Sequence, residues 1–302
     1  MLNRLIAPII VLFFWVANQA AAAISVLDDN GDTVLLQRPA QRIISMSPHI
    51  TELLFAAGGG NRIVGVVSYS DYPEAAKQLP RIGDNNEIDI ERVIAMKPDL
   101  FVVWWHGSSD KQVEQLRKLG IPMFYSEPRK LADIPGSLIR LGKLMGTDKG
   151  AQKAAAGLQR KLDALTAQYA NRPPVRLFYQ VWDKPLFTLN GQHIVSDAIR
   201  LCGGANIFAS MKATAPNVGI EAVLQEDPEA IVGTAEKNPS DGGVNMWKRY
   251  PTLTAVRRGN LFLVDGDLMN RAGPRMIDGA ADLCEKLEQV RKNRNEQIKV
   301  RP

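Results

Sequence analysis

Hydrophobic and polar positions along the chain alternate with the period of a helix in some segments and form short strand-like apolar runs in others. One unit, a helical segment followed by such a run, occurs twice. Residues 90–99 have the pattern of a short amphipathic helix that ends at a Pro-Asp pair, and the apolar run 100–105 follows. Residues 220–229 repeat this helix with a Pro-Glu pair, and the apolar run 230–233 follows. A helix pattern followed by a short apolar strand is typical of α/β proteins. The repeat therefore predicts two similar α/β halves.

Further alternating segments fill both halves. Strands are predicted over 42–46, 62–67, 121–125, 175–182 and 261–264, and helices over 51–57, 112–116 and 276–290. Ligands bind preferentially at interfaces between domains and at the carboxyl ends of parallel strands. We therefore expect an α/β fold of two Rossmann-like lobes with a ligand cleft between them.

The middle of the chain has a different pattern, typical of one long helix. Leu158, Leu162, Leu165 and Tyr169 form an apolar stripe at helical spacing, and the run 171–174 with its two prolines ends it. About 23 residues at 1.5 Å each give a rigid rod of about 35 Å, which permits only small hinge motion. We expect an N-terminal lobe over 24–136, linking helices over 137–172 and a C-terminal lobe over 173–302.

Residues 1–23 are predicted to be a signal peptide. Arg4 provides a positive start, residues 5–16 form a short apolar core, and four alanines at 20–23 suit a signal peptidase. The alternative is a membrane anchor, for which the apolar run is short. The pattern favours an exported, soluble protein of the periplasm.

Cys202 and Cys284 are the two cysteines. An even count in an exported protein favours one disulfide, and two buried free thiols are the alternative. Metal binding is not favoured, because no other Cys or His stands at a ligand spacing from either.

Charge and motifs exclude several functions. The chain has 37 basic and 32 acidic residues, a mixed surface that does not suggest a nucleic-acid partner. It contains no G-x-S-x-G, no P-loop and no H-E-x-x-H. An exported hydrolase would need a nucleophile and a base, for which Ser47 beside His49 is the only hint. We therefore expect a protein that is not an enzyme.

Flat and polar side chains gather where strands are predicted to end. Tyr69, Trp104, Trp182 and Arg271 lie at such positions. Aromatic rings provide contact area for a large planar ligand, and a few polar groups fix its orientation. Trp105 is more simply a core residue, because neighbouring strand residues point to opposite faces.

Three segments carry a family resemblance. Residues 65–73 (GVVSYSDYP), 202–208 (CGGANIF) and 271–275 (RAGPR) are similar to the cobalamin branch of the helical-backbone class of substrate-binding proteins. These periplasmic proteins serve bacterial ABC importers. The resemblance covers about residues 42–290, and the segment 65–73 is the most specific part of it.

The resemblance implies roles for particular residues. Tyr69 and Trp104 would face a corrin ring. The second-lobe aromatic of the family falls at Val181 and is missing here, and we expect the neighbouring Trp182 to substitute for it. Cys202 and Cys284 match the disulfide of the family, and Glu91 and Glu221 match the acids by which each lobe docks on a membrane permease. The second-lobe side of the cleft would be lined by Asp267, Leu268, Met269, Asn270 and Arg271.

The implied function is capture of a corrinoid, vitamin B12 or cobinamide, and its delivery to an ABC permease. We expect a monomer whose corrinoid is transported ligand and not a cofactor. Two tryptophans of the family, before the repeat helices, are replaced by residues 83–86 and 214–216, and Asn270 stands where an acid is expected. A haem or ferric-siderophore carrier on the same scaffold therefore stays an alternative, with His49, Tyr69 or Tyr72 as an axial ligand.

Overall fold

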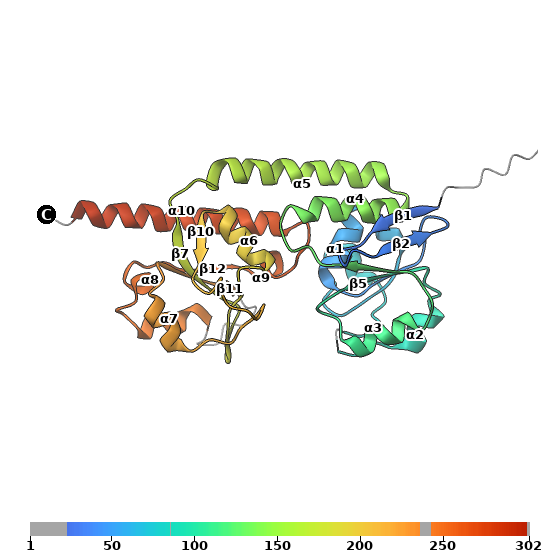
Figure 1. The fold of residues 1–302 in the computed structure, drawn as a ribbon, viewed down its shortest axis with the longest axis horizontal. Helices are drawn as coiled ribbons and strands as arrows, with labels where there is room; N and C mark the ends of the chain where they lie inside the picture. Colours follow the sequence, from blue (N-terminus) through green and yellow to red (C-terminus); the bar gives the residue numbers. More distant parts are fainter. Residues whose placement is uncertain (1–22, 85, 236–242, 301–302) are drawn as a thin grey trace, which may run out of the picture.

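The computed structural model describes residues 23–84, 86–235 and 243–300, and it consists of two α/β lobes side by side (Figure 1). The predicted two-lobe α/β fold is confirmed. Of the predicted signal peptide, only Ala23 lies within the described residues. Within each lobe the main sheet has four parallel strands.

Both sheets have the same strand order. The first runs β4-β3-β5-β6 and the second β10-β7-β11-β12, so each has the order second, first, third, fourth along the chain. The first-lobe strands are β3 (Ile43–Ser45), β4 (Ile63–Val66), β5 (Leu100–Trp104) and β6 (Met123–Ser126). The second-lobe strands are β7 (Val175–Gln180), β10 (Gly204–Asn206), β11 (Ala230–Ala235) and β12 (Leu261–Asp265).

Helices surround the sheets in both lobes. The first lobe carries α1 (Pro48–Ala56), α2 (Ile90–Ala95), α3 (Asp110–Arg117) and α4 (Asp133–Met145). The second carries α6 (Ile194–Leu201), α7 (Ile220–Glu226), α8 (Thr254–Arg257), α9 (Gly266–Met269) and α10 (Met276–Val300). Short 3-10 turns cover Gly60–Arg62, Glu74–Gln78 and Gly243–Arg249.

Two small hairpins complete the fold. One pairs β1 (Ile24–Leu27) with β2 (Thr33–Leu36), and the other pairs β8 (Trp182–Asp183) with β9 (Leu186–Phe187). The second hairpin begins inside the strand predicted over 175–182, which therefore ends earlier than expected, at Gln180.

The sequence repeat occupies equivalent places in the two sheets. Helix α2 leads into β5 and α7 into β11, the third strand of each lobe. Lys97 and Asp227, each before the proline of the repeat, have positive φ values of 46° and 40°. The acid after each proline then accepts hydrogen bonds from the chain entering the first strand: Asp99 from the amide of Arg42 at 2.8 Å and Glu229 from that of Arg176 at 3.3 Å.

The long helix α5 (Asp148–Tyr169) lies along one side of both lobes (Figure 1). Its 22 residues correspond to about 33 Å. The predicted stripe faces the protein, with Leu162 and Tyr169 buried and Leu158 and Leu165 packed against the core. Helix α5 packs closely against α4, and α4 also contacts α1 and β1.

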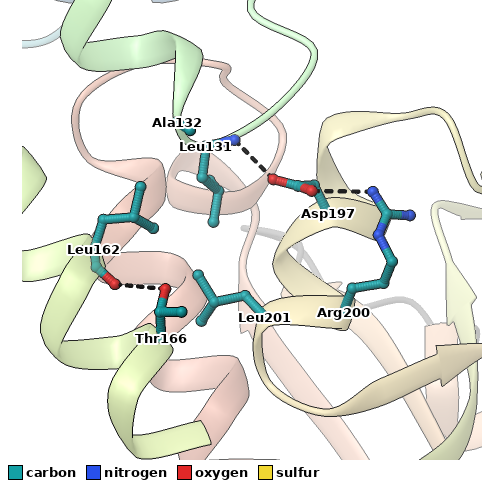
Figure 2. Close-up of a pocket in the computed structure, with 7 residues that line it drawn as sticks. All are labelled: Leu131, Ala132, Leu162, Thr166, Asp197, Arg200 and Leu201. Carbon is teal, nitrogen blue, oxygen red and sulfur yellow. Dashed lines mark hydrogen bonds and ion pairs between the residues drawn. The ribbon is translucent and has the colours of Figure 1, made fainter. Parts of the chain in front are cut away.

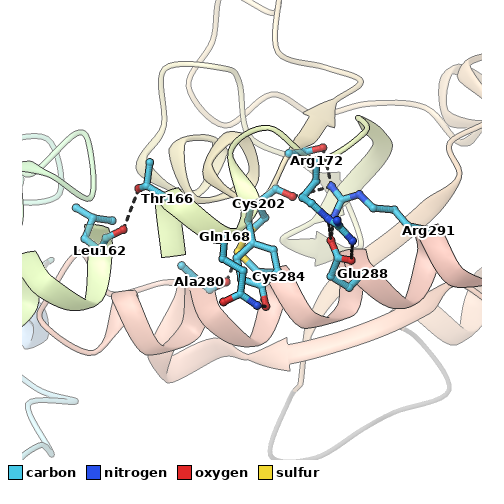
Figure 3. Close-up of a disulfide and its surroundings, with 11 residues drawn as sticks. Leu162, Thr166, Gln168, Arg172, Cys202, Ala280, Cys284, Glu288 and Arg291 are labelled. Carbon is cyan, nitrogen blue, oxygen red and sulfur yellow. Dashed lines mark hydrogen bonds and ion pairs between the residues drawn. A yellow bond between two sulfur atoms is a disulfide. The ribbon is translucent and has the colours of Figure 1, made fainter. Parts of the chain in front are cut away.

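The predicted disulfide is confirmed: Cys202, which follows α6, is bonded to Cys284 in α10 (Figure 3). Polar contacts surround it. Arg291 of α10 donates to the carbonyl oxygens of Cys202 at 2.8 Å and Gly203 at 3.1 Å. The same guanidinium pairs with Glu288, which Arg172 also contacts. The bond therefore ties the last long helix to the core of the second lobe.

Candidate ligand-binding site

The carboxyl edges of the two parallel sheets face each other. Asp71 follows β4 in the first lobe, and Arg271 follows β12 and α9 in the second. Arg271 Nη1 lies 2.7 Å from Asp71 Oδ1 and 3.3 Å from Glu52 Oε1 of helix α1. Because strand ends of both lobes meet here, this edge is where the fold would hold a ligand.

A second arginine strengthens this contact between the lobes. Arg275 binds Glu52 with two hydrogen bonds, Nε to Oε2 at 2.9 Å and Nη2 to Oε1 at 2.6 Å. The Glu52 side chain is 1% exposed, so the carboxylate is fully enclosed between the lobes. The Arg275 guanidinium also lies over the Tyr72 ring, 3.8 Å from its centroid.

The arginines stay charged in this setting. Burial by itself lowers the pKa of Arg271, but the hydrogen bonds to Asp71 and Glu52 and the charges of Asp267 and Asp71 raise it overall. The hydrogen bond to Glu52 raises the pKa of Arg275. Glu52, Asp71 and Arg275 form this contact between the lobes and were not among the predicted site residues. The R-x-G-P-R spacing at 271–275 was the signal that could have identified the second arginine.

On the first lobe, the two aromatic residues predicted to face the ligand differ in exposure. Tyr69 is 76% exposed and has a φ of 64°, so its loop presents the ring to solvent. Trp104 ends β5 and is partly buried against the core. Its ring meets the His49 ring edge to face, with centroids 5.4 Å apart. A Cβ at Gly107 would clash with the Trp104 ring, so this glycine is required for the close packing.

His49 does not fit the predicted role of axial ligand. Its side chain is buried, and its Nδ1 is 2.7 Å from the Ser47 hydroxyl oxygen. Its Nε2 is buried and has no hydrogen-bond partner among the described residues. Burial, followed by the charge of Arg271, lowers the pKa of His49 to about 3. A ring enclosed in this way does not offer a nitrogen to a metal in the cleft, so the alternative with His49 as axial ligand has no support in the structure.

The same observation bears on the hydrolase alternative. Ser47 and His49 are within hydrogen-bond distance, although neighbouring positions in a sequence rarely give this geometry. Both side chains are buried, at 2% and 4% exposure, so no substrate reaches the pair. In addition, no carboxylate orients the second ring nitrogen within the described part of the chain. The pair is therefore structural.

On the second lobe, Trp182 is 52% exposed at the start of the β8–β9 hairpin. Its indole nitrogen donates to the carbonyl oxygen of Lys184 at 3.1 Å, and it pairs across the hairpin with Phe187. Val181 packs against the core instead. The hairpin thus fixes an aromatic ring at the carboxyl end of β7.

The residues of the predicted segment 267–271 differ in exposure. Leu268 is half-buried, and Asn270 is exposed with its Oδ1 3.4 Å from the hydroxyl of buried Tyr179. Asp267 pairs with Arg271 at 3.0 Å. Met269 is a correction: its side chain is 0% exposed in the core, because α9 turns it inward, so it supports the segment and does not contact a ligand.

The predicted docking acids Glu91 and Glu221 are both exposed, in the first turns of α2 and α7. Within the described residues neither forms an ion pair. Both helices lie on the side of the molecule opposite α5, one on each lobe (Figure 1). The two acids therefore lie in equivalent helices on the same side of the molecule.

One cavity among the described residues lies away from the predicted site. It measures about 300 Å³ and sits beside α5, where the start of α4 meets α6 (Figure 2). Asp197 of α6 accepts from the amide of Leu131 at 2.9 Å and pairs with Arg200. None of the residues predicted to bind the ligand lines it. We regard it as a gap at the junction of the lobes, because its polar groups already bind each other.

No group of three or more metal-ligating side chains is found in the described segments. Among the helices that the structure describes, none combines the length and hydrophobicity needed to cross a bilayer.

Comparison with known proteins assigns this chain to a family. The periplasmic binding protein family matches residues 43–268, which include both sheets. The chain belongs to this family. Its relatives include vitamin B12-binding proteins of Vibrio parahaemolyticus, 35% identical over 86% of this chain and 94% of the relative, and of Yersinia pestis, 37% identical over 85% and 90%.

Solved structures of the family agree with the fold. The periplasmic vitamin B12-binding protein BtuF of Vibrio cholerae is 36% identical with a TM-score of 0.79, and the match covers 84% of this chain and 99% of that one. The haem-binding protein RhuT of Roseiflexus has a TM-score of 0.71 at 22% identity, over 83% and 99%. The second likeness concerns the fold alone. The vitamin B12-binding relatives are named as binding proteins.

Proposed function

We propose that this protein captures a corrinoid in the periplasm and delivers it to an ABC permease. The observation that carries the proposal is the likeness to vitamin B12-binding proteins, which are 35% to 37% identical over most of both chains. The transported corrinoid is the ligand, and no resident cofactor or covalent step is part of the proposal. We expect a monomer without a nucleic-acid partner.

The site supports a large, neutral, flat ligand. Tyr69, Trp104 and Trp182 provide rings at the ends of three different strands. The arginines between the lobes already bind Glu52 and Asp71, so they do not offer free positive charge. An anionic ferric siderophore, such as a catecholate complex, would require such charge.

The haem alternative has less support in the site. Haem needs an axial ligand that reaches the iron. His49 is buried, which leaves Tyr69 and Tyr72 as exposed candidates, and the Tyr72 ring is already stacked against Arg275. Cobalamin brings axial ligands of its own on both sides of the corrin ring and makes no such demand on the protein.

Location and partner follow from separate observations. The Cys202–Cys284 disulfide suits an oxidising compartment such as the periplasm, in agreement with the predicted signal peptide. The exposed carboxylates of Glu91 and Glu221 suit basic groups on a permease with two equivalent halves. We propose that each lobe docks through its own glutamate.

A co-elution experiment tests the ligand. The purified protein, expressed without residues 1–23, is mixed with excess cyanocobalamin and passed over a gel-filtration column. The visible absorbance of the corrinoid should elute with the protein at about one equivalent. Complete separation of the corrinoid from the protein would contradict the proposal, and the same run with haem tests the alternative carrier.

A further inference from the structure

We infer that Arg271 is a positioning residue that holds the Tyr69 loop from the opposite lobe. The first-lobe half of the site would then be assembled only while the lobes are in contact. The inference rests on the proposed function for its ligand, but it concerns a contact that is present without ligand.

The Tyr69 loop, residues 68–73, has a backbone that needs support. Tyr69 has a φ of 64°, in the left-handed region that bulky residues avoid. Its side chain is 76% exposed and cannot anchor the loop by its own packing. Such a conformation persists only where surrounding contacts fix it.

Contacts within the first lobe fix the beginning and middle of the loop. The Ser68 hydroxyl donates to the carbonyl oxygen of Gly83 at 3.0 Å, and Arg81 donates to that of Ser70 at 3.0 Å. The Ser70 hydroxyl is buried, 3.1 Å from that of Thr51. The two residues flanking Tyr69 are therefore held by their own lobe.

The end of the loop is held from the second lobe. Arg271 binds the Asp71 carboxylate at 2.7 Å, and the Arg275 guanidinium covers the Tyr72 ring at 3.8 Å. Asp71 is two residues from Tyr69, and its amide donates to the Tyr69 carbonyl oxygen at 3.0 Å. A change in the distance between the lobes therefore acts directly on the backbone of Tyr69.

Arg271 itself is not arranged to bind a ligand. Its Nη1 contacts Asp71 and Glu52, its Nη2 contacts Asp267, and its side chain is 13% exposed. Three carboxylates already surround this one guanidinium. Arg271 was predicted from the resemblance to line the cleft, and the geometry points to an action through Asp71 and the loop.

A double-mutant cycle with Tyr69 separates the two roles. The affinity for cyanocobalamin is measured by calorimetry for the wild type, Arg271→Gln, Tyr69→Ala and the combined variant. Arg271→Gln should weaken binding about tenfold, within the range for coupled contacts, but by less than about twofold in the Tyr69→Ala background. An equal loss in both backgrounds would overturn the inference. Arg172→Gln, which removes an ion pair far from the loop, is the matched control and should leave affinity unchanged.

Hydrogen exchange tests the contact without any ligand. In Arg271→Gln the peptide covering residues 68–73 should exchange at least about fivefold faster than in the wild type, while β5 exchanges as before. Asp71→Asn tests the same contact from the loop side if Arg271→Gln does not fold. Unchanged exchange of 68–73 in a folded variant would overturn the inference. If the wild-type protein does not bind cyanocobalamin, the proposed function is contradicted. The exchange result would still decide whether Arg271 holds the Tyr69 loop.

Discussion

Glu52 of the first lobe and Arg275 of the second form a two-point ion pair that closes the interface between the lobes. The two hydrogen bonds measure 2.9 and 2.6 Å, and the Glu52 side chain is 1% exposed. A second link, from the amide of Leu131 to Asp197, lies near α5 on the other side. Because α5 also bridges the lobes and Arg271 pairs with Asp71 across the same interface, several connections restrict their motion. We expect ligand-free and ligand-bound forms to differ little.

The first prediction concerns the Glu52–Arg275 pair. Glu52→Gln leaves two arginines enclosed without their shared carboxylate, so the free energy of unfolding should fall by about 3 kcal/mol. Urea denaturation measures this. Glu226→Gln is the matched control, because Glu226 pairs with Arg176 at the surface and should lose less than about 1 kcal/mol. Equal losses of unfolding free energy in the two variants would show that the enclosed pair stabilises the protein no more than a surface pair does.

Removal of the disulfide should cost stability but not ligand affinity. The bond between Cys202 and Cys284 closes a loop with a sequence separation of 82. Its loss in the double variant Cys202→Ala with Cys284→Ala should lower the free energy of unfolding by about 4 kcal/mol through greater freedom of the unfolded chain. Thermal unfolding and calorimetric titration with cyanocobalamin check both parts. A variant as stable as the wild type would contradict this account of the bond.

The stability should depend on pH through His49. Its pKa is about 3 in the folded protein and about 6.5 in the unfolded chain. Below pH 6.5 the unfolded state therefore binds a proton that the folded state does not bind until about pH 3, and stability falls as pH falls through this window. Between pH 7 and pH 5 this one group should cost about 2 kcal/mol.

His49→Gln should remove that part of the pH dependence. The measurement is the difference in unfolding free energy between pH 7 and pH 5. This difference removes any loss of stability that the substitution causes equally at both pH values. His106→Gln is the control, because the side chain of His106 is exposed. If His49→Gln keeps the full pH dependence of the wild type, the buried His49 imidazole is not the source of the loss of stability between pH 7 and pH 5.

Docking should depend on the two repeat glutamates. The double variant Glu91→Lys with Glu221→Lys should abolish cellular uptake of labelled cyanocobalamin, because it places like charges against the permease. Its affinity for cyanocobalamin in solution should stay within about twofold of the wild type, since both residues lie away from the carboxyl ends of the strands.

The control carries the same charge change at other exposed acids, Glu114 of α3 and Glu285 of α10, one on each lobe. Glu114→Lys with Glu285→Lys should transport normally. Normal uptake by the Glu91 and Glu221 variant would remove the docking assignment, and loss of uptake in both double variants would reduce it to an effect of net charge.

Local pattern predicted the repeat units, the long helix and the disulfide, because each depends on nearby residues or on a count of cysteines. It did not predict the β1–β2 hairpin, which is a short edge element. It also did not predict that Glu52 binds Arg275, because these residues are 223 positions apart and no periodicity connects them. Met269 was misplaced because a four-residue helix, α9, determines which way its side chain turns.

The most direct test of the central claim is a calorimetric titration of the signal-free protein with cyanocobalamin, cobinamide, haem and a ferric siderophore. The account predicts submicromolar binding of the corrinoids, weaker binding by Tyr69→Ala, and no heat of binding with haem or siderophore. Binding of haem with a shifted Soret band, and none of either corrinoid, would contradict it and identify a haem carrier on the same scaffold.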